Sequence, residues 1–171
     1  AFGISNAAAI YLGKTIGEKK MEHAKAYAVR FIWLSLLLGG LGGLLILLAA
    51  PLARANLALT TQAGSYLSFM FFVMSYFTVA QAFNTTMVIG IFRSGGDTKF
   101  GMIMDVSTMW GCSILLGAAA AFIFHAGVPV VYMILMSDEL IKIPITIKRY
   151  LSYKWLKDVT REREELEGEA V

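Results

Sequence analysis

Cysteine, proline and charge are all scarce in this chain of 171 residues. The single cysteine, Cys112, lies in an apolar stretch and cannot form an internal disulfide or a thiolate metal cluster. The net charge of +3 is too small to indicate nucleic acid as a partner. The sequence contains no phosphate-binding loop, nucleophile elbow, dinucleotide-binding fingerprint or cluster of metal ligands. We therefore expect neither an enzyme nor a protein with a bound cofactor or metal.

Charged residues make up only 16% of the chain, whereas 57% of the residues are hydrophobic. Soluble domains carry more charge than this. Asp, Glu, Lys and Arg are absent from four long stretches, which are residues 31–53, 55–92, 106–124 and 125–137. A helix of about 20 apolar residues spans the roughly 30 Å hydrocarbon core of a bilayer. The sequence therefore predicts an all-α fold, a polytopic membrane helix bundle with the lipid bilayer as a partner.

The uncharged stretches predict about four complete membrane-spanning helices and a partial one. The chain begins inside an apolar segment, so residues 1–17 are expected to be the end of a helix in a longer protein. Complete helices are expected over residues 26–52, 64–92, 100–124 and 128–149, followed by a charged tail over 150–171. Gly39 and Gly43 predict a close approach of two helices. Pro144 frees the backbone carbonyl of Leu140, which predicts either a kink or a polar contact.

Lysine and arginine fall almost entirely on one side of these helices. They occupy the loop after residue 13, the loop between Arg93 and Lys99, and the tail, whereas the opposite side receives only Arg54. Because short loops rich in Lys and Arg stay in the cytoplasm, we expect a multi-pass protein of the cytoplasmic membrane with a cytoplasmic C-terminus. Tyr153 and Trp155 are expected at the membrane–water interface, where aromatic side chains gather.

Ionisable residues inside a span are the strongest functional signal. Asp138 and Glu139 precede Lys142 by four and three residues, so both acids can pair with this lysine on one helix face. Two acids and one base leave one negative charge, which suits a relay for H⁺ or Na⁺. The alternative is a structural ion pair that fixes helix packing. Asp105, at the shallow end of its span, is expected to cap the helix, face a vestibule or bind a cation.

The span over 64–92 is the most polar one. Gln81, Asn84 and Thr85 are spaced i, i+3 and i+4 and therefore share one helix face. In hydrocarbon such a face turns toward protein or water, so it either lines a substrate cavity or joins helices. Tyr76 lies on the same span, where its ring either contacts a cationic substrate or packs against neighbours.

Three stretches of the sequence form a recognisable combination. The most specific is Gly90-Ile-Phe-Arg-Ser-Gly-Gly-Asp-Thr-Lys99, another is the small-residue helix end over residues 3–17, and the third consists of the spaced residues Trp110, Glu139, Lys142, Arg149, Trp155 and Thr160. Together they resemble the multidrug and toxic compound extrusion (MATE) family, whose signature G-x-x-R-x-G-G-D-T is similar to the first stretch.

The resemblance implies a transporter of twelve helices in two lobes, which exchanges H⁺ or Na⁺ for small organic, often cationic, drugs. Residues 1–17 then correspond to the end of helix eight and the four complete spans to helices nine to twelve. The partner of this second lobe is the N-terminal lobe of the same protein. The signature positions are Gly90, Arg93, Gly95, Gly96 and Asp97. The resemblance implies a structural role for them, with the adjacent glycines in a tight turn and Asp97 as a helix cap.

Three functions stay open at this point. The first is multidrug efflux by a secondary antiporter, with substrate against the polar face of span 64–92 and the ion on a carboxylate. The second, a flippase for lipid-linked sugars, needs a basic cavity for a pyrophosphate, and Lys142 is the only base deep in a span. The third is a non-transporting membrane subunit, whose activity would not change on neutralising Asp138, Glu139 and Lys142.

Overall fold

The computed structural model describes residues 1–57 and 60–157. These residues form only helices, in the order α1 (Phe2–Gly17), α2 (Met21–Asn56), α3 (Thr61–Thr85), η1 (Thr86–Phe92), α4 (Thr98–Thr108), η2 (Met109–Ile114), α5 (Leu115–Phe122), α6 (Val128–Leu135) and α7 (Asp138–Leu151). Both η segments are π-helical continuations of the helices before them. The all-α prediction is confirmed. Most of the predicted tail, with Thr160, lies outside the described residues.

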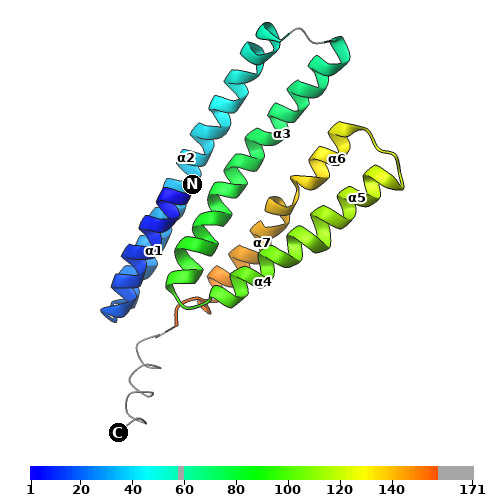
Figure 1. The fold of residues 1–171 in the computed structure, drawn as a ribbon. Helices are drawn as coiled ribbons and strands as arrows, with labels where there is room; N and C mark the ends of the chain where they lie inside the picture. Colours follow the sequence, from blue (N-terminus) through cyan, green and yellow to red (C-terminus); the bar gives the residue numbers. More distant parts are fainter. Residues whose placement is uncertain (58–59, 158–171) are drawn as a thin grey trace.

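The helices run as antiparallel rods, as Figure 1 shows. Three of them are long and apolar enough to cross a membrane, and they cover Met21–Asn56, Thr61–Phe92 and Thr98–Phe122. α6 and α7 follow each other along α5 and α4 and form the fourth rod. Large apolar side chains such as Trp33 and Leu45 of α2 are more than 60% exposed. Such a surface is stable against lipid but not against water.

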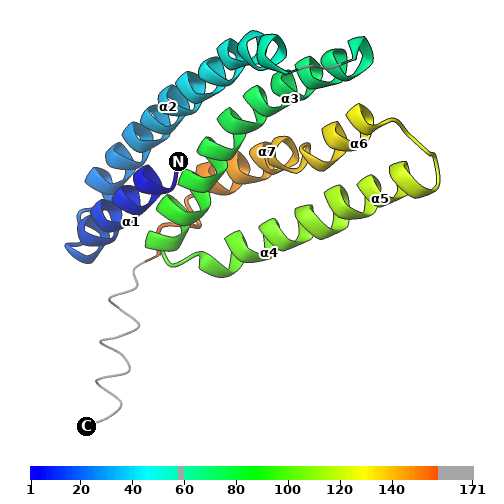
Figure 2. The same cartoon turned by 45° about the horizontal axis from the view of Figure 1, so that its top comes forward.

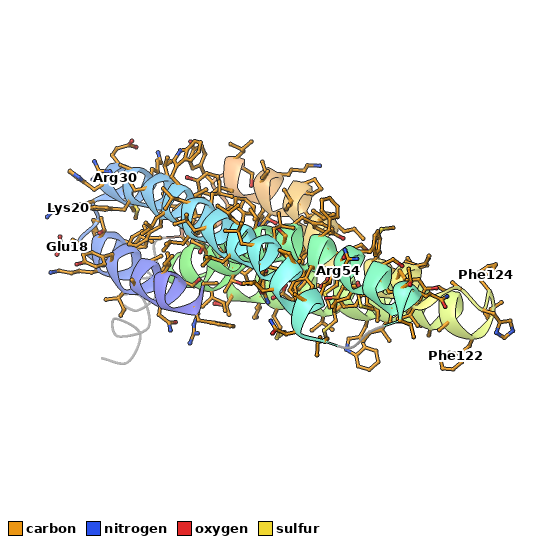
Figure 3. The ribbon with its side chains drawn as sticks, turned by 90° about the horizontal axis from the view of Figure 1, so that it is seen from above. Glu18, Lys20, Arg30, Arg54, Phe122 and Phe124 are labelled. Atoms are coloured by element: carbon orange, nitrogen blue, oxygen red, sulfur yellow. The ribbon has the colours of Figure 1, made fainter. Side chains whose placement is uncertain are left out.

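The basic turns gather at one end of the bundle. The turn between α1 and α2, the loop between α3 and α4, and the segment after α7 all lie there (Figure 1). Figure 3 shows Glu18, Lys20 and Arg30 at one end of the molecule and Phe122 and Phe124 at the other. The fold therefore separates the basic turns from the apolar ones along the helix axes.

Glycines on α2 allow α3 to approach closely. A Cβ atom on Gly39 would lie 2.8 Å from Ala82 Cβ, and one on Gly43 would lie 2.8 Å from the Ser75 carbonyl oxygen. The Ser75 hydroxyl donates a hydrogen bond of 3.0 Å to the Gly43 carbonyl. The close helix approach that the glycine spacing predicts is thus present, and α3 is the partner.

The main buried cluster lies at the basic end. It joins α1, the first half of α2, the end of α3 with η1, and the segment after α7, through Ala8, Leu12, Ile16, Ala24, Ala28, Phe83, Met87, Ile91, Phe92 and Trp155. Gly90 lets η1 pack on α1, because a Cβ there would lie 3.0 Å from Ala8 Cβ. The prediction that Trp155 sits at the membrane–water interface is wrong, since its side chain is completely buried in this cluster.

The last predicted span, 128–149, is not one helix. α6 ends at Leu135, α7 begins at Asp138, and Met136 and Ser137 interrupt the rod (Figure 2). The Ser137 hydroxyl donates a 2.7 Å hydrogen bond back to the Ile134 carbonyl, and serine is favoured where a helix starts. Pro144, where the sequence predicts a kink or a polar contact, lies inside α7, and the helix continues through it to Leu151.

The other boundaries differ from the predicted ones by a few residues. α2, α3 and α4 begin earlier than predicted, at Met21, Thr61 and Thr98, because polar residues that hydropathy does not count form their first turns. The predicted span 100–124 ends at Phe122 and contains the π-helical segment η2. These differences lengthen α2 and α4 at the basic end and α3 at the opposite end, and they leave the predicted order of spans unchanged.

Candidate functional site

A cavity of about 320 Å³ opens between α3, α4 and α7. Its polar lining consists of Gln81, Asn84 and Thr85 from α3, Asp105 from α4, and Asp138, Glu139 and Lys142 from α7. The sequence indicates a polar face on one span and an ion cluster on another, without saying whether they meet. The fold places both in the same cavity.

Lys142 is the centre of this lining. Its ammonium group lies 3.0 Å from an Asp138 carboxylate oxygen and 3.1 Å from one of Glu139, as the spacing along the helix predicts. The lysine side chain is only 7% exposed, and those of Asp138 and Glu139 are 13% and 12% exposed. Water therefore contributes little to stabilising these charges, and they depend on one another.

Asp105 is the third acid on the same lysine. One of its carboxylate oxygens lies 3.2 Å from the Lys142 ammonium, which joins α4 to α7. The helical spacing predicts two acids around this one base. The structure adds a third, so the excess of acid is larger by one than predicted. The Asp105 side chain is 47% exposed, so the cluster is accessible from its side. No group of His, Cys, Asp and Glu in the described part of the chain is arranged to hold a metal ion.

Asn84 fixes the position of Glu139. Its side-chain amide donates hydrogen bonds of 2.8 Å to a Glu139 carboxylate oxygen and 2.7 Å to the Glu139 backbone carbonyl. Its own carbonyl accepts a 3.2 Å bond from the Thr146 hydroxyl, which also donates to the Lys142 carbonyl. Asn84 is 3% exposed and Thr146 is fully buried. Thr146 is not among the site residues that the sequence pattern indicates, although its position four residues after Lys142 puts it on the same face of α7.

The remaining substrate candidates differ in position. Gln81 is exposed, and Thr85 is half-buried at the point where α3 passes into η1. Such π-helical turns are often found at functional sites. Tyr76 is not among the residues that line the cavity; it lies about two turns before Asn84, and its ring meets Phe72 edge to face.

Asp97 does not cap α4 as predicted. It occupies the capping position, but its carboxylate accepts two hydrogen bonds from the Arg149 guanidinium, of 2.7 and 2.9 Å, instead of bonding the helix. Lys157 Nζ lies 3.4 Å away. A bidentate arginine competes well with a backbone donor because both of its bonds are charge-assisted. Gly96, at φ 81°, makes the predicted tight turn before it, and Arg93 is exposed.

The ionisation of Asp97 is linked to stability. Burial alone would raise the pKa of its carboxyl, but the hydrogen bonds and charge of Arg149, with Lys157, outweigh burial and hold the pKa below its usual value. The stabilisation is therefore present above about pH 4, the value for an unfolded aspartate, and is lost as the pH falls through the lower pKa of the folded state.

We expect Asp97→Asn to lower the free energy of unfolding by about 1–3 kcal/mol near neutral pH, because two charge-assisted hydrogen bonds are weakened. The difference from wild type should stay constant between pH 7 and 5 and shrink below about pH 4. Unfolding curves of both proteins in detergent across this range measure it. A difference that persists undiminished in acid would contradict the assignment.

A comparison of the sequence with models of protein families identifies the family of the chain. The model of the MatE family matches residues 1–119, more than half of the chain. The chain belongs to the MatE family. A search of curated proteins and a search of solved structures gave no match. This MatE protein is therefore a MATE-type transporter that crosses the membrane several times.

The family model matches only some of the residues that line the cavity. The segment of the MatE protein that matches the family model includes Asn84, Asp105 and the loop between α3 and α4. α7, which carries Asp138, Glu139 and Lys142, lies beyond residue 119. The ion cluster of this MatE protein is therefore assigned from its geometry.

Proposed function

We propose that this MATE-type transporter is a secondary antiporter for multidrug efflux, which exchanges H⁺ or Na⁺ for small organic, often cationic, compounds. The observation that carries the proposal is the excess of acid in the cavity. Three carboxylates share the single ammonium of Lys142. When all four groups are ionised, negative charge remains that a cation can neutralise.

Excess negative charge gives a simple basis for exchange. A proton or Na⁺ and an organic ammonium group all stabilise the same carboxylates, so the binding of one disfavours the binding of the other. The cavity is open on the side of Asp105 and has apolar walls from Val88, Val106 and Met109. An apolar wall with a few charged groups suits an amphipathic cation.

The same proposal includes an orientation. Positive charge stays on the cytoplasmic side of short loops, so we place the basic end of the bundle, with the C-terminus, in the cytoplasm of a cell whose cytoplasmic membrane holds the protein. The chain then serves as the second lobe, and a first lobe of the same protein closes the substrate path. The lipid bilayer covers the exposed apolar side chains.

Charge favours the antiporter over a lipid-linked sugar flippase. A flippase has to bind a pyrophosphate, which needs unpaired basic groups. Lys142 is the one basic side chain that lines the cavity described here, and three carboxylates already neutralise it. A non-transporting subunit is the remaining alternative, and it predicts that changes in the cluster leave transport untouched.

The test is ethidium efflux by the complete protein in a host that lacks its own efflux pumps. We expect Asp138→Asn/Glu139→Gln to reduce the efflux rate at least tenfold at matched expression, because the excess negative charge is removed. Vesicles that carry a pH gradient or a Na⁺ gradient then distinguish the coupling ion.

Glu22→Gln serves as the matched control, since Glu22 is an exposed acid that pairs with Lys25 at the basic end. It should leave efflux unchanged. Full efflux by the cavity variant would exclude a role for Asp138 and Glu139 in ion exchange, and release of a lipid-linked sugar by wild type would favour the flippase.

A further inference from the structure

The segment that follows α7 packs against the loop between α3 and α4. The Lys157 N–H donates a 3.1 Å hydrogen bond to the Gly95 carbonyl. A Cβ atom at position 95 would lie 1.9 Å from the Trp155 carbonyl oxygen and 2.8 Å from its ring atom Cε3. Only glycine therefore leaves room for Trp155 at this point, which explains the first of the two adjacent glycines.

Trp155 is held by shape and stacking. Its ring stacks on that of Tyr150, with 5.8 Å between ring centroids and 10° between planes. The side chain is completely buried, and its indole N–H has no hydrogen-bond partner in the described part of the chain. Burial of so large a ring strongly favours the docked position.

Charged groups complete the contact. Arg149, near the end of α7, binds Asp97 through two hydrogen bonds and lies over the Phe100 ring, 4.5 Å from its centroid. Asp97 immediately precedes α4. We use the term clasp for Gly95, Asp97, Arg149 and Trp155, which tie the end of α7 to the start of α4.

The clasp and the ion cluster connect the same two antiparallel helices. From Asp97 to Asp105 along α4 is about 12 Å, and from Arg149 back to Lys142 along α7 is about 10 Å, at 1.5 Å per residue. The two ion pairs, Asp97–Arg149 and Asp105–Lys142, therefore require the same register between α4 and α7. A shift of α7 by one turn, about 5.4 Å, would break both.

The N-terminal end of α7 does not continue an earlier helix. The helix is interrupted at Met136 and Ser137, so no continuous helix joins α6 to α7. The 14 residues of α7 are thus a stiff element between a break at one end and the clasp at the other. Contacts near 3 Å around Lys142 tolerate little axial movement.

We infer that the clasp residues Asp97, Arg149 and Trp155 are positioning residues for transport. They fix the register of α7 on α4, and this register brings Asp105 to Lys142, beside the two carboxylates that α7 itself supplies. The inference rests on the proposed function, because it assigns to the clasp control over the site where the coupling ion binds. Opening the clasp changes the affinity of the site for that ion without touching the site.

The test variant is Asp97→Asn/Arg149→Met, which opens the clasp without leaving a buried charge unpaired. In the complete protein we expect a fivefold or larger shift in the H⁺ or Na⁺ concentration at half-maximal ethidium efflux, with the melting temperature within a few degrees of wild type. Trp155→Phe, a gentler change, should shift it in the same direction. Lys20→Gln, which breaks an exposed ion pair with Glu18 at the same end, should shift nothing. An unchanged half-maximal concentration together with a lowered melting temperature overturns the inference.

A second readout does not require transport. In a cysteine-free background, Thr85→Cys places one thiol in the cavity wall, and its rate of labelling by a maleimide reports the opening of the cavity. We expect the clasp variant to label several-fold faster than its parent. If the parent of the first assay moves no ethidium, the proposed function fails, and the labelling rate alone decides: faster labelling supports control of the cavity by the clasp, and an unchanged rate overturns it.

Discussion

Lys142→Met is expected to lower the free energy of unfolding by about 3–5 kcal/mol, because it leaves buried carboxylates without their partner. Lys142 is the only group that neutralises Asp138 and Glu139 in the described structure, and both acids are nearly buried. Without it the acids repel each other in a place that water hardly reaches. Chemical unfolding in detergent micelles, at pH 7, measures the loss.

The matched control removes the acids together with the base. Lys142→Met/Asp138→Asn/Glu139→Gln should recover most of the lost stability, because replacing all partners of a buried ion cluster costs far less than replacing one. Asp105 remains, but its side chain is half-exposed and is far less buried than Asp138 and Glu139. If the triple variant is no more stable than Lys142→Met, the loss comes from packing of the lysine stem and not from unpaired charge.

Gly43→Leu is expected to cost at least about 2 kcal/mol through overpacking between α2 and α3. The Cβ atom alone would lie 2.8 Å from the Ser75 carbonyl oxygen and 3.3 Å from a Val79 methyl group. The backbone oxygen cannot rotate away, so the helices have to separate. Separation also breaks the hydrogen bond from Ser75 to the Gly43 carbonyl. The melting temperature of the purified protein reports the loss.

Gly40→Leu is the control on the same helix, since a Cβ at Gly40 has nothing within 4 Å. A leucine there should be neutral or slightly stabilising, because leucine favours helix more than glycine does. Equal losses at positions 40 and 43 would mean that helix propensity or lipid contact, and not the approach of α3, determines the effect.

Local patterns made much of this structure predictable. Uncharged runs indicate the spans because a bilayer leaves few alternatives to helices. The contacts of Lys142 with Asp138 and Glu139 follow from helical spacing alone. The glycine contact of α2 follows from its four-residue spacing, although the sequence does not say which helix is the partner.

What the sequence could not reveal depends on residues far apart in the chain. The contact between Asp105 and Lys142 requires the register of α4 on α7, and the bonds from Asn84 to Glu139 span 55 positions. Asp97 has the pattern of a helix cap, but Arg149 offers a stronger partner. Tryptophan is a residue type typical of the membrane–water interface, yet the space left by the missing side chain of Gly95 lets Trp155 pack there and become buried. In each case a tertiary contact overrides a sound local preference.

The interruption at Met136 and Ser137 has an electrostatic consequence. Aligned peptide dipoles give each helix roughly half a negative charge at its C-terminus and half a positive charge at its N-terminus. In a continuous helix these charges would appear only at the membrane surfaces, whereas here the N-terminus of α7 lies at Asp138 and Glu139. The first-turn N–H groups of α7 therefore lend partial positive charge to Asp138 and Glu139, while the carbonyl end of α6, two residues away, carries the opposite sign. The break thus places both a donor end and an acceptor end of a helix inside the bundle, which a continuous helix would keep at the membrane surfaces.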